Sequence, residues 1–303
     1  MNKDYKRKIL IDTDIGDDID DAFAVALACA CNCELVAVTT VFRNTKLRAR
    51  QVMQLLKAAG KDVPVYVGDG MPLGGKIVPF GIDSPDSDLL NDPPCQYDES
   101  MDAFREGGNA AEEIVRFAKK YSGELIVVPI GGMTNIAKAL IIDPTIAKDI
   151  KAVVAMHGWY ENFSPEWNVI CDPEAANVVY SSGIPFYGVG LDVTLKCVLD
   201  DNLLTEFRKS QKPVNKLIIA WLDRWFDRFR FEKSVMHDPL AVSFAVGADT
   251  LKFKKVYARA VTEGEKRGAV QTSATDKEGF YPINYAYDVD VEKFYSLIRE
   301  KML

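Results

Sequence analysis

The chain has 303 residues, 48% of them hydrophobic, and a formal net charge of −7 at neutral pH. This acidic balance argues against a surface that binds nucleic acid or an anionic membrane. No apolar stretch is as long as a membrane span, and the charged N-terminal residues are not followed by the apolar core of a signal peptide. We therefore expect a cytoplasmic protein with a single domain over residues 1–303.

Candidate strands and helices alternate along the chain. The expected strands are residues 8–11, 35–41, 65–67, 125–129, 152–155 and 186–189, and the expected helices are residues 20–30, 44–59, 110–120, 135–141, 173–182 and 202–209. This alternation predicts an α/β fold with an open, mostly parallel, Rossmann-like sheet and helices on both faces. Two segments interrupt it. Residues 70–106 form a long loop rich in Gly, Pro and Asp, and residues 262–284 indicate a late hairpin or mobile flap.

Aspartate is concentrated where the first strand meets the first helix. Six aspartates fall between positions 12 and 21, namely Asp12, Asp14, Asp17, Asp18, Asp20 and Asp21. Helix capping explains one or two of them, such as Asp17 or Asp18. It does not explain Asp12 and Asp14 at the strand end, where carboxylates in such number repel one another unless a cation compensates them. A hard divalent cation with oxygen ligands, Ca²⁺ or Mg²⁺, is the simplest compensator.

The six cysteines do not indicate a different metal. Cys29, Cys31 and Cys33 alternate along the chain, which is unlike the paired spacing of zinc sites, and the other three are scattered. Free cysteine is commonly a small buried hydrophobic residue, so we expect no zinc centre.

Four motifs in the same order resemble those of one enzyme family. They are DTDIGDDIDDA at residues 12–22, GGMTNIAKAL at 131–140, PEWNVICDPEAA at 165–176 and MHDPLAV at 236–242. Together they resemble the nucleoside hydrolases, the inosine–uridine-preferring N-ribohydrolase superfamily. The resemblance covers roughly residues 8–242 and implies a fold of the nucleoside hydrolase type.

The resemblance also implies a reaction and a set of residues. Members hydrolyse the N-glycosidic bond of ribonucleosides, to ribose and free base, with a Ca²⁺ ion that binds the ribose diol and the attacking water. By resemblance, the ion would be held by Asp14, Asp21, the backbone carbonyl of Thr134 and Asp238. Asp14 would also be the general base, which suits a carboxylate beside a metal-bound water. The substrate would be contacted by Asp20, Asn44, Met156, Glu166 and Asn168.

The first motif departs from the commonest form of the family. Ile15 occupies a position where proline is usual, and two extra residues precede the Asp20–Asp21 pair. This insertion leaves open whether Asp18 also approaches the ion. Asp12 is expected to support the ligands from behind.

The leaving base needs protonation or a hydrogen bond, because negative charge develops on it. By resemblance, His237 would be the acid, and His157 is the alternative. Trp225 and Phe229 could stack on the base. Alternatively, they belong to an amphipathic helix that packs against the core.

Two alternative functions stay open. A strand ending in Asp-x-Asp also begins the haloacid-dehalogenase-like phosphatases, which use Mg²⁺, although Ile15–Gly16 fits them poorly. A non-catalytic protein that binds ribose or a nucleoside would share most of the same residues. The family resemblance also implies a homodimer or homotetramer.

Overall fold

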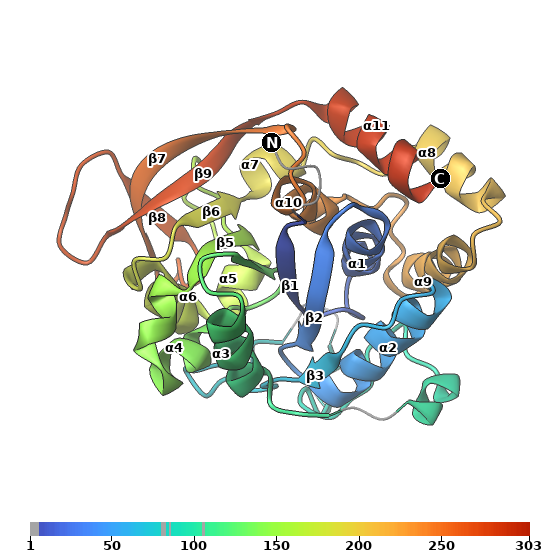
Figure 1. The fold of residues 1–303 in the computed structure, drawn as a ribbon, viewed down its shortest axis with the longest axis horizontal. Coiled ribbons are helices and arrows are strands. Elements are labelled where there is room, and N and C mark those ends of the chain that lie inside the picture. Colours follow the sequence, from blue (N-terminus) through green and yellow to red (C-terminus); the bar gives the residue numbers. More distant parts are fainter. Residues whose placement is uncertain (1–5, 80–82, 85, 105–106) are drawn as a thin grey trace.

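A nine-stranded sheet crosses the computed structural model, which describes residues 6–79, 83–84, 86–104 and 107–303 (Figure 1). Within these residues the strand order is β3-β2-β1-β4-β5-β6-β9-β7-β8. The strands are β1 (Lys8–Thr13), β2 (Glu34–Thr40), β3 (Val65–Val67), β4 (Leu125–Pro129), β5 (Ile150–Met156), β6 (Phe186–Val189), β7 (Leu251–Ala260), β8 (Val270–Ser273) and β9 (Tyr281–Val289). From β3 to β9 the neighbours pair in parallel, and β7 pairs antiparallel with β9 and β8.

Helices cover both faces of the sheet. They are α1 (Asp20–Ala30), α2 (Thr45–Ala58), α3 (Ala110–Lys120), α4 (Thr134–Ile142), α5 (Trp167–Cys171), α6 (Pro173–Ser181), α7 (Leu191–Thr194), α8 (Asp201–Lys209), α9 (Pro213–Phe229), α10 (His237–Ala245) and α11 (Val291–Met302). Every strand and helix expected from the sequence forms, and no end differs by more than two residues. The predicted fold class is confirmed.

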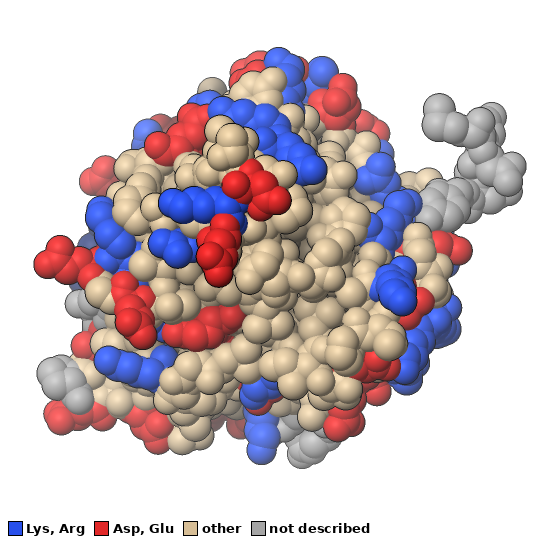
Figure 2. Space-filling model, turned by 90° about the vertical axis from the view of Figure 1, so that its left-hand side faces the viewer, with Lys and Arg blue, Asp and Glu red and all other residues tan. Residues whose placement is uncertain are grey.

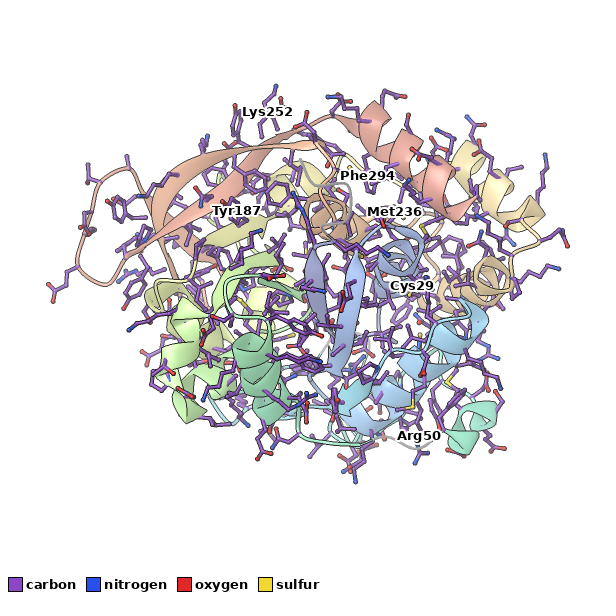
Figure 3. The ribbon with its side chains drawn as sticks, viewed as in Figure 1. Cys29, Arg50, Tyr187, Met236, Lys252 and Phe294 are labelled. Carbon is purple, nitrogen blue, oxygen red and sulfur yellow. The ribbon has the colours of Figure 1, made fainter. Side chains whose placement is uncertain are left out.

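The strand β1 shows why the sheet is covered on both sides. Its residues alternate, so that Ile9 and Ile11 join an apolar cluster with α1, α2, α9, α10 and α11, whereas Leu10 joins the cluster of α3, α4 and α6. Successive side chains of a strand point to opposite faces. A strand buried on both faces therefore reads as a continuous apolar run. Phe294 of α11 and Met236 lie in the first cluster (Figure 3).

The C-terminal part adds strands that the sequence pattern did not predict. β7, β8 and β9 form the antiparallel edge of the sheet, which extends away from the helices in Figure 1. Residues 262–284 contain the turn between β7 and β8, all of β8 and the start of β9, so this segment is a hairpin rather than a flap. The strand β7, LKFKKVYARA, is rich in charged residues because much of it is exposed.

A long connection joins β3 to α3. Among its described residues, the only regular element is a short 3₁₀ helix, Glu99–Ala103. Positions 80–82, 85 and 105–106 of the predicted loop lie outside the described residues, as do positions 1–5 of the N-terminal segment. The described part reaches the carboxyl end of β1, where Gln96 donates a hydrogen bond to the backbone carbonyl of Asp18 at 2.8 Å.

Lys and Arg side chains are interspersed with Asp and Glu on the face that Figure 2 shows. Across the described ranges, no helix combines the length and the apolar character needed to cross a membrane.

Candidate active site

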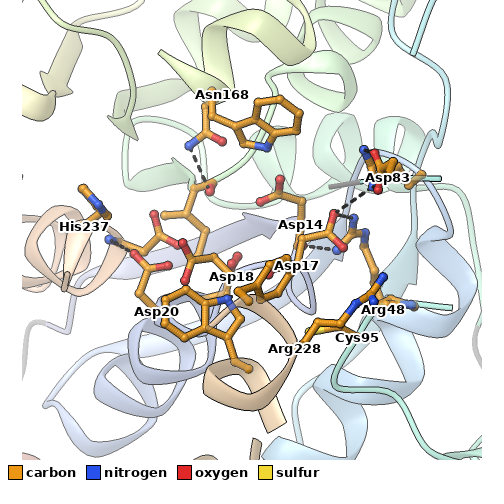
Figure 4. Close-up of a pocket in the computed structure, with 18 of the residues that line it drawn as sticks. Asp14, Asp17, Asp18, Asp20, Arg48, Asp83, Cys95, Asn168, Arg228 and His237 are labelled. Atoms are coloured by element: carbon orange, nitrogen blue, oxygen red, sulfur yellow. Dashed lines mark hydrogen bonds and ion pairs between the residues drawn. The ribbon is translucent and has the colours of Figure 1, made fainter. Parts of the chain in front are cut away.

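A cavity of about 520 Å³ opens at the carboxyl ends of the parallel strands. β1 lies between β2 and β4, so the direction of strand order reverses at β1. Neighbouring crossovers diverge at such a point and leave a crevice, which is where open α/β sheets bind ligands. Figure 4 shows Asp14, Asp17 and Asp18 in the middle of the view, with Asp20 and His237 at one end and Asp83, Arg48 and Cys95 at the other.

Three buried carboxylates meet in the cavity wall. Asp20 and Asp21 come from the first turn of α1, Asp238 comes from the first turn of α10, and one oxygen of each lies within 4.8 Å of the others. Burial and the other acidic groups raise the pKa of all three well above the usual range. A bound cation would remove this penalty. Within the described residues, this is the only group of three or more His, Cys, Asp or Glu side chains close enough to hold a metal ion.

Asp14 lies beside this triad rather than in it. Among the neighbouring charges, Asp14 raises the pKa of Asp21 most. Burial raises the pKa of Asp14 itself to about 7, although the positive charge of Arg48 opposes that shift. A Cβ on Gly131 would lie 2.7 Å from Asp14 Oδ1, so the glycine of the second motif leaves room for the Asp14 carboxylate in this position. Asp20 is therefore the third member of the close group of carboxylates, and Asp14 lies next to that group.

Two further predicted residues, Asp12 and Thr134, lie behind the cavity wall. Asp12 Oδ1 accepts hydrogen bonds from Thr39 Oγ1 at 2.6 Å and Asn135 Nδ2 at 2.8 Å. Its Oδ2 is buried and has no hydrogen-bond partner among the described residues. The hydroxyl of Thr134 is also buried and donates to Asp172.

Sequence reasoning missed the supporting roles of Asn135 and Asp172. Each belongs to a motif that the resemblance had used, MTNIA and CDPEAA, and each is a polar residue beside a helix start. That position was the signal that could have identified them.

The predicted sugar-binding residues line the cavity. The Glu166 carboxylate precedes α5 and accepts the backbone N–H groups of Gly158, Asn168 and Val169 at 2.9, 2.9 and 3.2 Å. Asn168 Nδ2 donates to the backbone carbonyl of Met156 at 3.0 Å. These bonds hold both side chains in one orientation.

Asn44, from the other side of the cavity, also lines it. It precedes α2, where its Oδ1 accepts the N–H of Leu47 at 3.2 Å. Its Nδ2 donates to the backbone carbonyl of Asn91 at 2.6 Å.

The two histidines differ in position. His237 lines the cavity, its Nδ1 lies 2.7 Å from the hydroxyl of Thr194, and burial lowers its pKa to about 4. His157 is fully buried, contacts the Tyr180 hydroxyl through Nδ1 at 3.0 Å, and does not line the cavity. The expectation that His157 reaches the base pocket is therefore wrong. Met156 faces the cavity at the end of β5, and the next side chain points to the opposite face.

Aromatic residues of α9 both pack in the core and line the cavity, the two alternatives that the sequence left open. Trp225 is only 4% exposed and belongs to the apolar core, yet Trp225 and Phe229 also line the cavity. Trp225 Nε1 donates to the backbone carbonyl of Asp17 at 3.2 Å. Asp18 lines the cavity as well, but it lies outside the triad, and its Oδ1 accepts the N–H of Ile19 at 2.6 Å.

Comparison with known proteins places this site in a family. The model of the inosine-uridine preferring nucleoside hydrolases matches residues 9–296. The chain is 31% identical to uridine nucleosidase 1 of Arabidopsis thaliana, over 98% of this chain and 93% of that protein. It is 28% identical to the pyrimidine-specific ribonucleoside hydrolase RihB of Escherichia coli O9:H4 (strain HS), over 97% and 96% of the two chains.

Solved structures agree with this assignment. An inosine-guanosine nucleoside hydrolase superposes with a TM-score of 0.80 at 25% identity, covering 97% of this chain and 98% of that one. A plant nucleoside hydrolase superposes with a TM-score of 0.82 at 24% identity, covering 98% and 99%, and shows the shared fold. None of these matches supports the alternative function of a haloacid-dehalogenase-like phosphatase. The chain belongs to the family of inosine-uridine preferring nucleoside hydrolases and is a hydrolase of N-glycosyl bonds.

Proposed function

We propose that this chain hydrolyses the N-glycosidic bond of ribonucleosides with the help of a bound Ca²⁺ ion, and releases ribose and the free base. The observation that carries the proposal is the buried triad of Asp20, Asp21 and Asp238 in the wall of a cavity that could hold a nucleoside. Sugar-facing polar groups and an aromatic wall complete the same cavity.

The donor set suits a hard divalent cation. Asp21 and Asp238 are implied as ligands by the family resemblance and are also members of the triad. Asp20 is supported by the triad alone. Asp14 and the Thr134 carbonyl are supported by the resemblance alone. All are oxygen donors, which Ca²⁺ prefers. When bound, the ion would orient the ribose diol and lower the pKa of a water molecule.

Asp14 is the proposed general base. Its buried carboxylate lines the cavity beside the triad. A bound cation would make a water molecule more acidic, and a carboxylate beside that water can then accept its proton.

Asn44, Glu166 and Asn168 are proposed to bind the sugar hydroxyls, with Met156 against the ring. Glu166 and Asn168 are held by backbone hydrogen bonds before any ligand arrives. Such preorganised groups can contact the sugar without further loss of side-chain entropy.

His237 is proposed to assist the departing base. Because burial lowers its pKa to about 4, its imidazole is neutral near pH 7. If the Thr194 hydroxyl donates to Nδ1, the proton of the neutral ring is on Nε2. Nε2–H would then donate a hydrogen bond to the base as negative charge develops there. Thr194 would select the tautomer that His237 needs.

We propose that the base lies against the aromatic part of the cavity lining, within reach of His237. Trp225, Phe229 and Phe231 line the cavity, as do Pro93 and Pro94. Aromatic and apolar walls stack on any base without reading its polar edge. We therefore propose a preference for the ribose over the identity of the base.

A panel of substrates tests the proposal. The purified protein should release base from uridine and inosine and nitrophenolate from nitrophenyl riboside, but no phosphate from nitrophenyl phosphate. Chelation should abolish the activity, and added Ca²⁺ should restore it. Binding of nucleosides without turnover on any riboside would instead support a ribose-binding protein.

A further inference from the structure

Arg48 is a buried cation at one end of the cavity, and its role rests on the function proposed above. It belongs to the first half of α2 and is fully buried. Among the residues that the structure describes, it is the only Lys or Arg in the buried class. A buried arginine persists only where its donors are satisfied, so its partners indicate what it does.

One side of the guanidinium holds the acidic turn between β1 and α1. Nη1 donates to the backbone carbonyls of Asp14 and of Ile15, the latter at 2.7 Å. Nη2 donates to Asp17 Oδ2 at 2.6 Å. This turn is the segment that the two extra residues lengthen, and it carries the proposed general base.

Close packing leaves this turn little freedom on its other side. Gly16 has φ of +117°, and a Cβ there would lie 2.4 Å from Pro94 Cβ. The turn therefore fits between the guanidinium of Arg48 and the long loop, and a small movement of either would displace Asp14.

The other side of the guanidinium holds the turn between β2 and α2. Nε donates to the backbone carbonyl of Phe42 at 2.8 Å. Phe42 and Arg43 both have left-handed backbone conformations, with φ of 65° and 59°. Such conformations are costly for residues other than glycine and persist only where the surroundings enforce them. Asn44, one of the proposed sugar ligands, follows directly.

We propose that Arg48 is a positioning residue that fixes the acidic turn and the left-handed turn relative to each other, and so sets the spacing of Asp14 and Asn44. Three carbonyls and one carboxylate converge on a single planar group. The donors of a guanidinium point in fixed directions, whereas the ammonium of lysine is a point charge on a flexible stem. Lysine would keep the charge but not hold both turns.

Arg50 provides a matched control on the same helix. It lies on the outer side of the molecule (Figure 3), where Nη1 forms an ion pair with Asp102 at 2.6 Å. Arg50→Lys therefore makes the same chemical change two positions away, outside the proposed site.

The test is hydrogen–deuterium exchange of the metal-free protein, which needs neither activity nor an ion. Arg48→Lys should accelerate exchange in residues 13–20 and 41–46 together, while residues 125–129 and 150–156 in β4 and β5 exchange as in the wild type. Arg50→Lys should change neither turn. Unchanged exchange in both turns, or equal acceleration in β4 and β5, would overturn the proposal.

Binding measurements add a second readout. Arg48→Lys should weaken Ca²⁺ binding in calorimetry by about tenfold or more, as loss of a residue that orients ligands usually does. Wild-type Ca²⁺ affinity in this variant would contradict the positioning role. If the wild-type protein itself binds no Ca²⁺ or cleaves no riboside, the proposed function fails, but the exchange result still decides what Arg48 does.

If Arg48→Lys does not fold, Asp17→Asn decides the question. This change keeps the guanidinium and its three carbonyl partners, and the Asp17 side chain is 30% exposed, so the fold should tolerate it. It should accelerate exchange in residues 13–20 more than in residues 41–46, where it removes only the longer ion pair of Asp17 with Arg43 at 3.9 Å. Wild-type exchange in residues 13–20 would show that the ion pair does not hold the acidic turn.

Discussion

The backbone N–H of Asp238 donates a hydrogen bond to Asp20 Oδ2 at 2.9 Å, across 218 residues of sequence. This bond joins the first turn of α10 to the first turn of α1. Both carboxylates therefore lie at helix N-termini, where partial positive charge favours them. The acidic triad is assembled by two helices that are far apart in the sequence and pack against each other in the fold.

The first prediction concerns the ion. Asp14→Ala should remove both Ca²⁺ binding and activity, and Asp20→Asn should weaken Ca²⁺ binding because the triad loses one negative charge. Calorimetry on chelator-treated protein measures both. Asp249→Asn is the control, since that side chain is 97% exposed. An Asp14→Ala variant with one Ca²⁺ per chain and normal turnover would contradict the assignment.

The second prediction concerns pH. Burial raises the pKa of Asp12 to about 6 and of Asp14 to about 7, and raises those of the triad further above the usual range. A raised pKa stabilises the fold below the unfolded-state pKa near 3.8, and this stabilisation is lost as the pH rises through the folded-state value. The metal-free protein should therefore unfold at a higher temperature at about pH 5.5 than at about pH 7.5.

Two groups oppose this trend without reversing it. Burial lowers the pKa of His157 to about 3 and of His237 to about 4. The folded protein therefore loses stability from these two residues as the pH falls below 6.5, because they protonate more readily in the unfolded chain. The buried carboxylates outnumber them. Calorimetric unfolding in chelator at the two pH values checks the sign, and added Ca²⁺ should reduce the difference, because the ion needs deprotonated ligands. A higher unfolding temperature at the higher pH in chelator would refute the prediction.

The third prediction concerns the sugar. Removal of the 2′-hydroxyl should lower kcat/KM by about a hundredfold or more, because polar groups built to bind it would stay unpaired. Exchange of uracil for hypoxanthine should cost much less, since Trp225 and Phe229 offer faces rather than hydrogen bonds to the base. Steady-state rates on uridine, 2′-deoxyuridine and inosine measure both effects. Similar rates on the first two would rule out recognition of the diol.

The fourth prediction concerns the leaving group. His237→Gln should lower turnover on inosine by on the order of a hundredfold, yet spare nitrophenyl riboside, whose leaving group needs no proton. Thr194→Val should give a smaller loss with the same dependence on substrate, because it removes the partner of Nδ1. Equal losses on both substrates would mean that His237 orients the sugar or the ion instead.

His157→Gln is the control for this experiment, since His157 lies outside the cavity. It should leave the ratio of the two rates unchanged. A selective loss on inosine in this variant would return the role to His157.

The alternating apolar segments by themselves determined the mostly parallel sheet and the helices on both faces. Strands such as β1 and β4 are continuous apolar runs because both faces are buried, and this signal is local. The acidic run after β1 is local too, which is why a cation site could be predicted there. Most residues of β7 and β9 are half-buried or exposed, so the mixed composition of these strands carried no comparable signal.

Only the tertiary structure decided which carboxylates meet and which histidine reaches the cavity. The distance between Asp20 and Asp238 depends on how α1 packs against α10, and no sequence spacing encodes it. The burial of His157 follows from the direction of one side chain at the end of β5. Arg48 could not be recognised from the sequence either, because its partners on two separate turns come together only when β1 and β2 pair.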